Sequence, residues 1–419
     1  MDLATQIDQL LARHVTPGGP GAAIGVIQGG EFIHRKAYGL ADLEWGTPLD
    51  PDCVFRIASL TKPFTATAIM MLAERGALSI DDPIETHLPW WPARGRRTTI
   101  RHLLTHTSGV WRHDWDRELR MTRPDIRTAE ILPLIGEHEF EFGPGAAYRY
   151  NNSGFLLLGA IIEAVSGRKF FDFLREAIFE PLGMRHTGEL RYESVTPRRA
   201  RGHVRGRSGF HNARPDGEMF SYAAGGLGST LDDLALWDRA LREHRLLRPE
   251  TLEAMLAPTV LSDGSAYPYG FGWGITDDYL GQRICHHAGG VSGFACQMLR
   301  LRDLDLTTIV LSNLYLFPFD QVNRGLLRIA LDQPLETPAL TVPTVEQLAR
   351  CTGTYIGEEG RPFEIGAGPP WAALGDDRLC DPADPEVEHR FSELRDGVFQ
   401  RLDYVSPLWP TSTWRRATG

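Results

Sequence analysis

Lysine is scarce in this 419-residue sequence: of its 44 basic residues, only Lys36, Lys62 and Lys169 are lysines, and the other 41 are arginines. An arginine guanidinium keeps its proton at physiological pH, whereas a desolvated lysine can lose its proton and act as a base. If the protein uses a lysine as a base, it is one of these three residues.

Cysteines and long apolar runs are scarce as well. The five cysteines show no C-x-x-C spacing, which argues against a zinc ribbon or a disulfide framework. Buried free thiols are favoured, although Cys285 and Cys296 could face each other across a hairpin. The longest apolar stretch, residues 155–165, is interrupted by Glu163 and falls short of the roughly 18 residues that a membrane span requires. The sequence therefore predicts no contact with a membrane.

The N-terminal residues contain neither the basic nor the apolar region of a secretory signal. This predicts a cytoplasmic protein, or a periplasmic one if a signal has been removed. The net charge of −10, without any basic block, argues against nucleic-acid binding because the phosphates would be repelled. We therefore expect a small molecule as the partner, with a homodimer as a candidate assembly.

Several common catalytic signatures are also missing. There is no Gly-x-Ser-x-Gly motif, which excludes the nucleophile elbow of α/β-hydrolases. Dinucleotide and Walker signatures are absent, so no organic cofactor is expected. His102 and His106 are four residues apart and could share a helix face, but no third ligand is near them in the sequence. We therefore predict no metal site.

Hydrophobic periodicity predicts the main elements. Leu3, Ile7 and Leu10 have helical spacing, and Gly29-Gly30 separates two short strands in a hairpin. A long helix is expected from near Ser59 to Gly76. The remaining predictions are strands over 22–28, 32–38, 269–275, 283–287, 294–301 and 307–311, and helices over 155–165 and 322–331.

Antiparallel strands at both ends of a mostly helical segment predict an α+β fold, in which both ends complete one sheet and a helical subdomain is inserted between them. The length favours one large domain and a smaller one. We assign residues 1–333 to the large domain, the proline-punctuated segment 334–345 to a linker, and residues 346–419 to a small β-rich domain.

Ser59 stands one helical turn before Lys62, which would place a hydroxyl nucleophile beside a base. The spacing alone is weak evidence, because Ser166 and Lys169 show it too. Ser166 follows the apolar helix and is typical of a helix end, whereas Ser59 opens a helix, whose free N–H groups favour a developing anion. On spacing alone, Ser59 could equally be an ordinary N-cap serine.

Two further segments carry candidate catalytic groups. After the tight turn at 142–145, Tyr150 and Asn152 can face one cleft, and a tyrosine near a lysine can share its proton; an aromatic turn with an asparagine cap is the alternative. In the second segment His287 precedes Gly289 and Gly290, whose small size would let a carbonyl approach the backbone. The N–H groups of Ser59 and Gly290 would then form an oxyanion hole. A histidine with a purely structural role is the alternative here.

Together with residues 102–109, 224–230 and 269–273, these segments resemble a family of serine hydrolases over about 330 residues. The family includes class C β-lactamases, DD-peptidases, family VIII esterases and D-aminopeptidases. The resemblance implies a β-lactamase/transpeptidase-like antiparallel sheet flanked by helices. It also implies the site roles: Ser59 as the acylated nucleophile, Lys62 as its base partner, Tyr150 as the proton shuttle, Asn152 as a ligand of the lysine and the substrate amide, and the N–H groups of Ser59 and Gly290 as oxyanion donors.

The sequence departs from the β-lactamase pattern at His287-Ala288-Gly289, where those enzymes usually carry Lys-Thr-Gly. That lysine binds the substrate carboxylate, so a mostly neutral histidine disfavours β-lactamase or DD-carboxypeptidase activity. A His-x-Gly triplet is similar to that of D-aminopeptidases and many of the esterases. An added β domain, resembling half of a lipocalin-like pair, also makes D-aminopeptidases the nearest resemblance.

The resulting prediction is a cofactor-independent serine hydrolase that forms an acyl-enzyme on small amides or peptides, of the D-aminopeptidase or D-amino-acid amidase type. A β-lactamase-like carboxylesterase or DD-peptidase is one alternative, and a non-catalytic penicillin-binding-type protein is another. Asp114 and Asp116 are expected in a loop near the cleft, where they either bind a substrate ammonium or are solvated.

Overall fold

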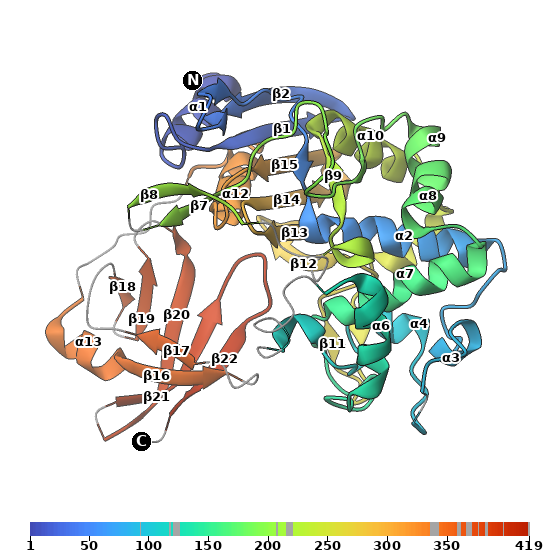
Figure 1. Ribbon diagram of the computed structural model, residues 1–419. Coiled ribbons are helices and arrows are strands. Elements are labelled where there is room, and N and C mark those ends of the chain that lie inside the picture. Colours follow the sequence, from blue (N-terminus) through green and yellow to red (C-terminus); the bar gives the residue numbers. More distant parts are fainter. Residues whose placement is uncertain are drawn as a thin grey trace. The chain divides into compact units, whose positions relative to one another are not determined.

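The computed structural model describes residues 1–92, 94–116, 119, 126–206, 208–214, 221–335, 343–357, 362–365, 371–375, 377–381, 384–396 and 398–417. The chain divides into two compact units, Met1–Asp278 with Gln282–Asp332, and Tyr279–Gly281 with Gln333–Gly419. Each unit has its own sheet and its own hydrophobic core (Figure 1).

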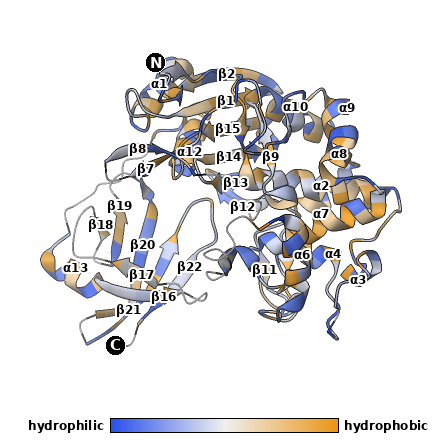
Figure 2. Cartoon of the chain, in the orientation of Figure 1, coloured by the Kyte–Doolittle hydropathy of each residue, from blue (hydrophilic) through white to orange (hydrophobic). Residues whose placement is uncertain are grey.

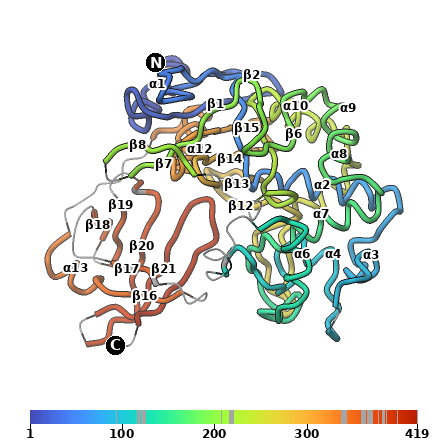
Figure 3. Tube along the Cα trace, viewed as in Figure 1, coloured from blue at the N-terminus to red at the C-terminus, as the bar shows by residue number. Residues whose placement is uncertain are grey.

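The first unit is built on a six-stranded sheet that both ends of the unit complete. Its order is β12-β13-β14-β15-β1-β2. Strand β1 pairs antiparallel with β15, so Ala22 lies opposite Ser312 although 290 residues separate them in the chain (Figure 3). The strands are β1 Ala22–Gln28, β2 Glu31–Tyr38, β12 Gly274–Tyr279, β13 Gln282–Val291, β14 Phe294–Leu301 and β15 Leu306–Ser312.

Both faces of this sheet are covered, because every residue of β14 and β15 is buried. Successive side chains of a strand point to opposite faces. The Sγ of Cys296 lies 3.0 Å from the carbonyl oxygen of Ile57, whereas the Nε2 of Gln297 lies 2.9 Å from the Oδ1 of Asp320 in the last helix of this unit. The segment before Ser59 therefore packs on one face, and α12 (Phe319–Ala330) packs on the other together with α1 (Leu3–Ala12).

Helices inserted between β2 and β12 form the other half of the unit. The central helix, α7 (Asn152–Ser166), packs against α2 (Thr61–Glu74), and residues Thr61–Leu72 of α2 are all buried. Figure 2 shows the apolar residues of these helices. The other helices and helical turns are η1 Ala58–Leu60, α3 Ile84–His87, α4 Ile100–Leu104, η2 His113–Trp115, α6 Thr128–Glu137, α8 Phe170–Leu174, η3 Arg175–Phe179, α9 Glu180–Leu182, η5 Tyr222–Ala224, α10 Leu231–Arg242, α11 Pro249–Met255 and η6 Arg302–Leu304.

Short strands connect the helices to the sheet. In the sheet β5-β9-β6, the pairing of Phe55 with Ser229 fixes the chain just before Ser59. The short strands are β3 Leu40–Asp42, β4 Thr47–Pro48, β5 Phe55–Arg56, β6 Gly188–Glu189, β7 His203–Gly206, β8 Gly209–Asn212, β9 Leu227–Ser229, β10 Thr259–Val260 and β11 Ala266–Tyr267.

The second unit contains a short helix, α13 (Val345–Cys351), and a seven-stranded sheet of order β17-β16-β22-β21-β20-β19-β18. Its core includes Tyr355, Phe391 and Leu402. The strands are β16 Gly353–Gly357, β17 Pro362–Ile365, β18 Ala372–Gly375, β19 Arg378–Asp381, β20 Asp384–Arg395, β21 Val398–Val405 and β22 Ser412–Arg416. Residues 336–342 of the predicted linker lie outside the described residues, and the predicted domain boundaries and lipocalin-like half stay predictions.

The predicted α+β architecture and most predicted elements are confirmed, including the hairpin at Gly29-Gly30 and the helix end at Ser166, where Gly167 takes the left-handed conformation. The strand predicted over 269–275 is wrong, because β12 begins at Gly274. Gly272 has a φ of +73°, and a Cβ there would lie 2.9 Å from the carbonyl oxygen of Lys62. The segment is therefore a turn packed against α2 and not an extended strand.

All five cysteines are buried and free, as predicted. Among the described residues no helix is both long and apolar enough to cross a bilayer.

The buried ion pair between Asp238 and Arg300 yields a stability prediction. The Oδ1 of Asp238 on α10 accepts hydrogen bonds from the Nε of Arg300 (2.6 Å) and the Oγ1 of Thr307 (2.9 Å), which attaches α10 to the sheet. Asp238→Ala leaves a buried guanidinium without its partner, and we expect the free energy of unfolding to fall by about 3–5 kcal/mol in chemical denaturation.

The matched control is Glu31→Ala, which removes the exposed ion pair with Arg239 and should change the free energy of unfolding by less than about 1 kcal/mol. Equal effects of the two substitutions would contradict the structural importance of the buried pair.

Candidate active site

Ser59 lies in the 3-10 turn η1, between the short strand β5 and helix α2. The preceding residue, Ala58, is buried and has a φ of +46°, a conformation that costs a non-glycine residue of order 1 kcal/mol. The surrounding β5-β9 pairing and η1 packing hold this conformation. As a result Ser59 is presented at the start of α2 with its side chain half-exposed.

The Nζ of Lys62 is completely buried and lies among three oxygen atoms. These are the Oγ of Ser59 at 2.9 Å, the Oδ1 of Asn152 at 2.7 Å and the carbonyl oxygen of Ala224 at 2.8 Å. An ammonium has three N–H groups, so these acceptors satisfy it fully. Lys36 and Lys169, by contrast, form exposed ion pairs with Asp8 and Glu163.

Burial lowers the pKa of Lys62 to about 7, although the negative charge of Asp114 opposes this shift. The amine is then neutral in a large fraction of molecules at neutral pH. A neutral amine can keep its two N–H groups on Asn152 and Ala224 while its lone pair faces the hydroxyl of Ser59. This is the geometry that proton removal from the serine requires.

Tyr150 is half-buried next to both residues. The Nζ of Lys62 lies 4.8 Å from the centre of its ring, and its phenol is hydrogen-bonded to Ser59. Burial raises the pKa of Tyr150 despite this hydrogen bond. The phenol therefore keeps its proton at neutral pH, which suits a proton donor.

Asn152 connects Lys62 to a carboxylate that the sequence did not identify as part of this cluster. Its Nδ2 donates to the Oδ2 of Asp114 at 2.9 Å, which fixes the amide with its oxygen toward Lys62. The sequence placed Asp114 in a loop near the cleft, either binding an ammonium or solvated. It is buried in the helical turn η2 and therefore not solvated, and only the tertiary fold shows this contact.

His287 is buried on β13 and belongs to a chain of hydrogen bonds. The backbone N–H of Asn151 donates to the Nδ1 of His106 (3.1 Å), whose Nε2 lies 3.2 Å from the hydroxyl of Tyr269. That hydroxyl lies 3.0 Å from the Nε2 of His287, and the Nδ1 of His287 lies 2.7 Å from the carbonyl oxygen of Ala288. Sequence analysis did not identify Tyr269 or His106 as partners of His287.

Gly289 brings β13 alongside the nucleophile. A Cβ on this residue would lie 2.3 Å from the carbonyl oxygen of Ile57 and 3.0 Å from the backbone nitrogen of Ser59, so only glycine fits. Gly290 is exposed and a Cβ there would meet nothing within 4 Å, so the next backbone position faces open space. The oxyanion hole of Ser59 and Gly290 stays a prediction.

The absence of a metal site stays a prediction from the sequence. His102 and His106 do not share a helix face, because α4 ends at Leu104 and His106 has a φ of +58°. His102 instead caps its own helix by contacts with Thr99. Within the described ranges, no group of three or more histidines, cysteines or carboxylates could hold a metal ion.

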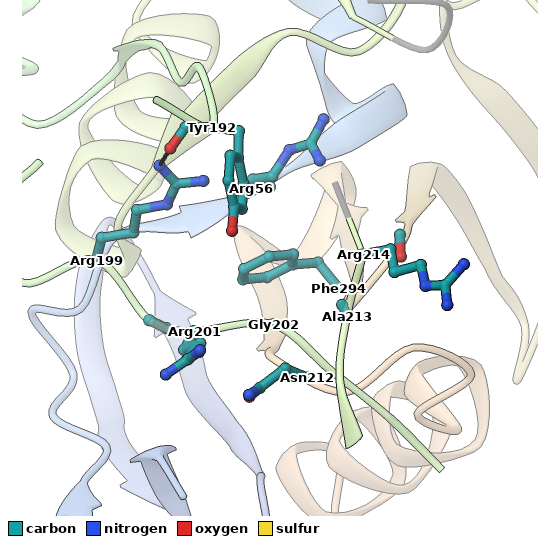
Figure 4. Close-up of a pocket in the computed structure, with 11 residues that line it drawn as sticks. Arg56, Tyr192, Arg199, Arg201, Gly202, Asn212, Ala213, Arg214 and Phe294 are labelled. Carbon is teal, nitrogen blue, oxygen red and sulfur yellow. Dashed lines mark hydrogen bonds between the residues drawn. The ribbon is translucent and has the colours of Figure 1, made fainter. Parts of the chain in front are cut away.

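A pocket of about 180 Å³ lies at the turn between β13 and β14. Figure 4 shows the rings of Phe294 and Tyr192 facing it and the guanidinium groups of Arg56, Arg201 and Arg214 pointing in different directions. The Nη1 of Arg199 donates to the carbonyl oxygens of Arg191, Tyr192 and Ser194.

Comparison with known proteins places these features in context. The model of a family described as Beta-lactamase matches residues 7–332. The chain is 33% identical to penicillin-binding protein 4* of Bacillus subtilis, over 68% of this chain and 66% of that protein. It is 28% identical to the D-aminopeptidase of Gluconobacter oxydans, over 81% of this chain and 64% of that protein. The chain thus covers slightly less than two thirds of these relatives.

Solved structures give a consistent result. The D-amino acid amidase of Ochrobactrum anthropi SV3, in its complex with L-phenylalanine amide, matches with a TM-score of 0.69 at 26% identity. The match covers 79% of this chain and 99% of that one. The octameric penicillin-binding protein homologue of Pyrococcus abyssi matches with a TM-score of 0.72 at 24% identity, over 99% of this chain, and shares the fold.

The contact between Asn152 and Asp114 yields a testable expectation for Lys62. Because the charge of Asp114 raises the pKa of Lys62, Asp114→Asn should lower this pKa further. Covalent modification of Ser59 by a fluorophosphonate should then keep its rate to lower pH than in the wild type. The measurement is the pH dependence of the modification rate. If the acidic limb of this pH dependence is unchanged in Asp114→Asn, or moves to higher pH, the charge of Asp114 does not raise the pKa of Lys62 and the prediction fails.

Proposed function

The chain belongs to the β-lactamase family, and we propose that it is a serine hydrolase that forms an acyl-enzyme on small amides or peptides, of the D-aminopeptidase or D-amino-acid amidase type. The observation that carries the proposal is the buried Nζ of Lys62, 2.9 Å from the Oγ of Ser59. An amine with a pKa of about 7 is matched to proton transfer at neutral pH.

In the acylation step the neutral amine of Lys62 accepts the proton of Ser59. The Oγ forms a bond to the substrate carbonyl carbon, and the π electron pair moves to the carbonyl oxygen. The backbone N–H groups of Ser59 and Gly290 donate to this oxyanion. Asn152 and Ala224 keep the lysine nitrogen in place while its charge changes.

Collapse of the oxyanion breaks the bond to the leaving nitrogen. Tyr150 donates its proton to that nitrogen and takes a proton from Lys62 in return, so no tyrosinate accumulates. In the second half of the reaction a water molecule takes the place of the leaving group. As the water attacks the carbonyl carbon of the ester, its proton passes to the neutral amine of Lys62, with Tyr150 as a relay that gives up one proton for the one it takes. Collapse of the oxyanion then breaks the bond to the Oγ of Ser59, which takes the proton back from Lys62.

The charges around the nucleophile support an amine-bearing substrate. Asp114 places a buried carboxylate 2.9 Å from the amide of Asn152, where it can attract a substrate ammonium. Burial lowers the pKa of His287 to about 3, so this residue provides no cation for a carboxylate. The similarity to the D-aminopeptidase of Gluconobacter oxydans and to the D-amino acid amidase of Ochrobactrum anthropi SV3 supports a preference for D-amino acids.

A carboxylesterase is the second candidate, and the neutral His287 also favours it. An ester without a carboxylate leaves no unpaired charge at this position. Esterase EstB of Burkholderia gladioli is 31% identical over 70% of this chain and 86% of that protein. The homodimer and the cytoplasmic or periplasmic location expected from the sequence stay predictions.

Ser59→Ala should abolish covalent labelling by a fluorophosphonate while leaving the circular dichroism spectrum unchanged. Ser166→Ala is the matched control, because Ser166 has the same spacing to a lysine but ends α7. It should be labelled like the wild type. Persistent labelling of the Ser59 variant at an unchanged rate would refute the assignment of the nucleophile.

A panel of chromogenic substrates tests the substrate class. We expect the largest kcat/KM for D-alanine p-nitroanilide, a smaller value for the L-enantiomer and the smallest for a cephalosporin that carries a carboxylate. Preference for a short-chain p-nitrophenyl ester over both anilides would favour the esterase. If no member of the panel is turned over and Ser59 is not labelled, the result would favour a non-catalytic binding protein.

A further inference from the structure

The hydrogen-bond chain that ends at His287 has a fixed direction. A backbone N–H can only donate, so the N–H of Asn151 makes the Nδ1 of His106 an acceptor. The proton of a neutral His106 is then on Nε2, and it is donated to the hydroxyl oxygen of Tyr269. The chain starts from the backbone between Tyr150 and Asn152, so its anchor is part of the active-site wall.

The direction continues to the last ring. Because the oxygen of Tyr269 accepts from His106, its own proton is directed to the Nε2 of His287 at 3.0 Å. The proton of a neutral His287 is then on Nδ1, where the carbonyl oxygen of Ala288 accepts it at 2.7 Å. Both ring nitrogens of His287 therefore have a partner within the protein. The carbonyl oxygen of Ala288 can only accept a hydrogen bond, so it stabilises the tautomer that has its proton on Nδ1.

We propose that Tyr269 is a positioning residue for substrate specificity: its hydroxyl holds the Nε2 of His287 as an acceptor, which keeps a cation out of this end of the site and selects against substrates that carry a carboxylate beside the scissile bond. The inference rests on the proposed function, because it concerns the same acylation site. The favoured substrates are amides and esters whose leaving group is uncharged.

Two neighbours of His287 also disfavour its protonated form, whereas the hydrogen bond to the carbonyl oxygen of Ala288 favours it. Among the described residues, the titratable groups that face it are Lys62 on α2, His106 after α4, Tyr150 before α7, Tyr269 and the neighbouring His286. Lys62 and His286 both disfavour a proton on His287, and burial has the largest effect on its pKa. Within the described part of the chain, no carboxylate contributes to the pKa shift of His287.

The burial of the chain explains why one hydroxyl can have this effect. The exposed fractions of His106, Tyr269 and His287 are 1%, 5% and 5%, so water cannot readily replace a lost partner. If the phenol is removed, the Nε2 of His287 keeps a lone pair with no donor. Protonation of the ring then becomes easier, because a protonated Nε2 is free to bind an anion.

The first test uses the wild-type protein and needs no turnover. In ¹⁵N-histidine NMR spectra, with His287 assigned by its loss in His287→Gln, we expect an Nδ1–H tautomer that does not titrate between pH 8 and pH 5. An Nε2–H tautomer, or titration of His287 within this range, would overturn the proposal.

The second test compares Tyr269→Phe with the wild type on two substrates that share a scissile bond, D-alanyl-D-alanine and D-alanyl-D-alaninamide. The readout is the ratio of their kcat/KM values between pH 8 and pH 5.5. In the wild type, the ratio should show no change with pH that can be attributed to protonation of His287. In the variant, the ratio should shift toward the carboxylate substrate by about tenfold as the pH falls, chiefly through KM, because a charged hydrogen bond becomes available.

Two controls identify the origin of the effect. Tyr267→Phe removes a phenol whose ring stacks on Tyr148, a neighbour of Tyr269, and it should leave the ratio unchanged. Adding His287→Gln to Tyr269→Phe should abolish the pH-dependent gain. A ratio in Tyr269→Phe that equals the wild-type ratio at every pH would overturn the proposal. If neither dipeptide is cleaved and Ser59 is not labelled, the proposed function fails, and the NMR spectra still decide the state of His287.

Discussion

The structure of this site depends on the burial of one amine. Lys62 contributes its nitrogen from the first turn of α2, Asn152 its amide from the first residue of α7, and Ala224 its carbonyl from η5. These segments are far apart in the chain and meet at a single atom. A buried ammonium is unfavourable unless it is fully hydrogen-bonded, and burial also lowers its pKa, so that the neutral amine, which can accept a proton, is populated at neutral pH. The same contacts therefore stabilise the cluster and prepare the group that we propose as the base for Ser59.

Asp114 and His287 have different electrostatic roles in the proposed site. Asp114 lies on the side of Asn152, where it moderates the effect of burial on Lys62. By the resemblance to β-lactamases His287 takes the place of their lysine, and we propose that Tyr269 keeps its ring in the neutral form. A substrate that carries an amine near Asp114 and no carboxylate near His287 has no charged group without a partner of opposite charge. This arrangement gives the amidase and esterase hypotheses a common physical basis, and it distinguishes both of them from β-lactamase activity.

Much of this could be predicted from the sequence, because the signals are local. The hairpin around Gly29-Gly30 and the stop at Ser166-Gly167 depend on backbone preferences, and the spacing of Ser59 and Lys62 follows from one helical turn. The missed features depend on tertiary contacts. Asp114 meets Asn152 across 38 residues, and Tyr269 meets His106 across 163. The alternating residues 269–273 imitate a strand, but Gly272 turns the chain at the carbonyl of Lys62.

The pKa of Lys62 is the quantity on which the account rests most directly. Because the chain has only three lysines, the side-chain resonances of labelled lysine are few, and that of Lys62 can be assigned by its loss in Lys62→Arg. NMR titration of the wild-type protein should show Lys62 losing its proton at a pH of about 7. Titration of Lys62 near 10.4, the usual value for a solvated lysine, would contradict the account.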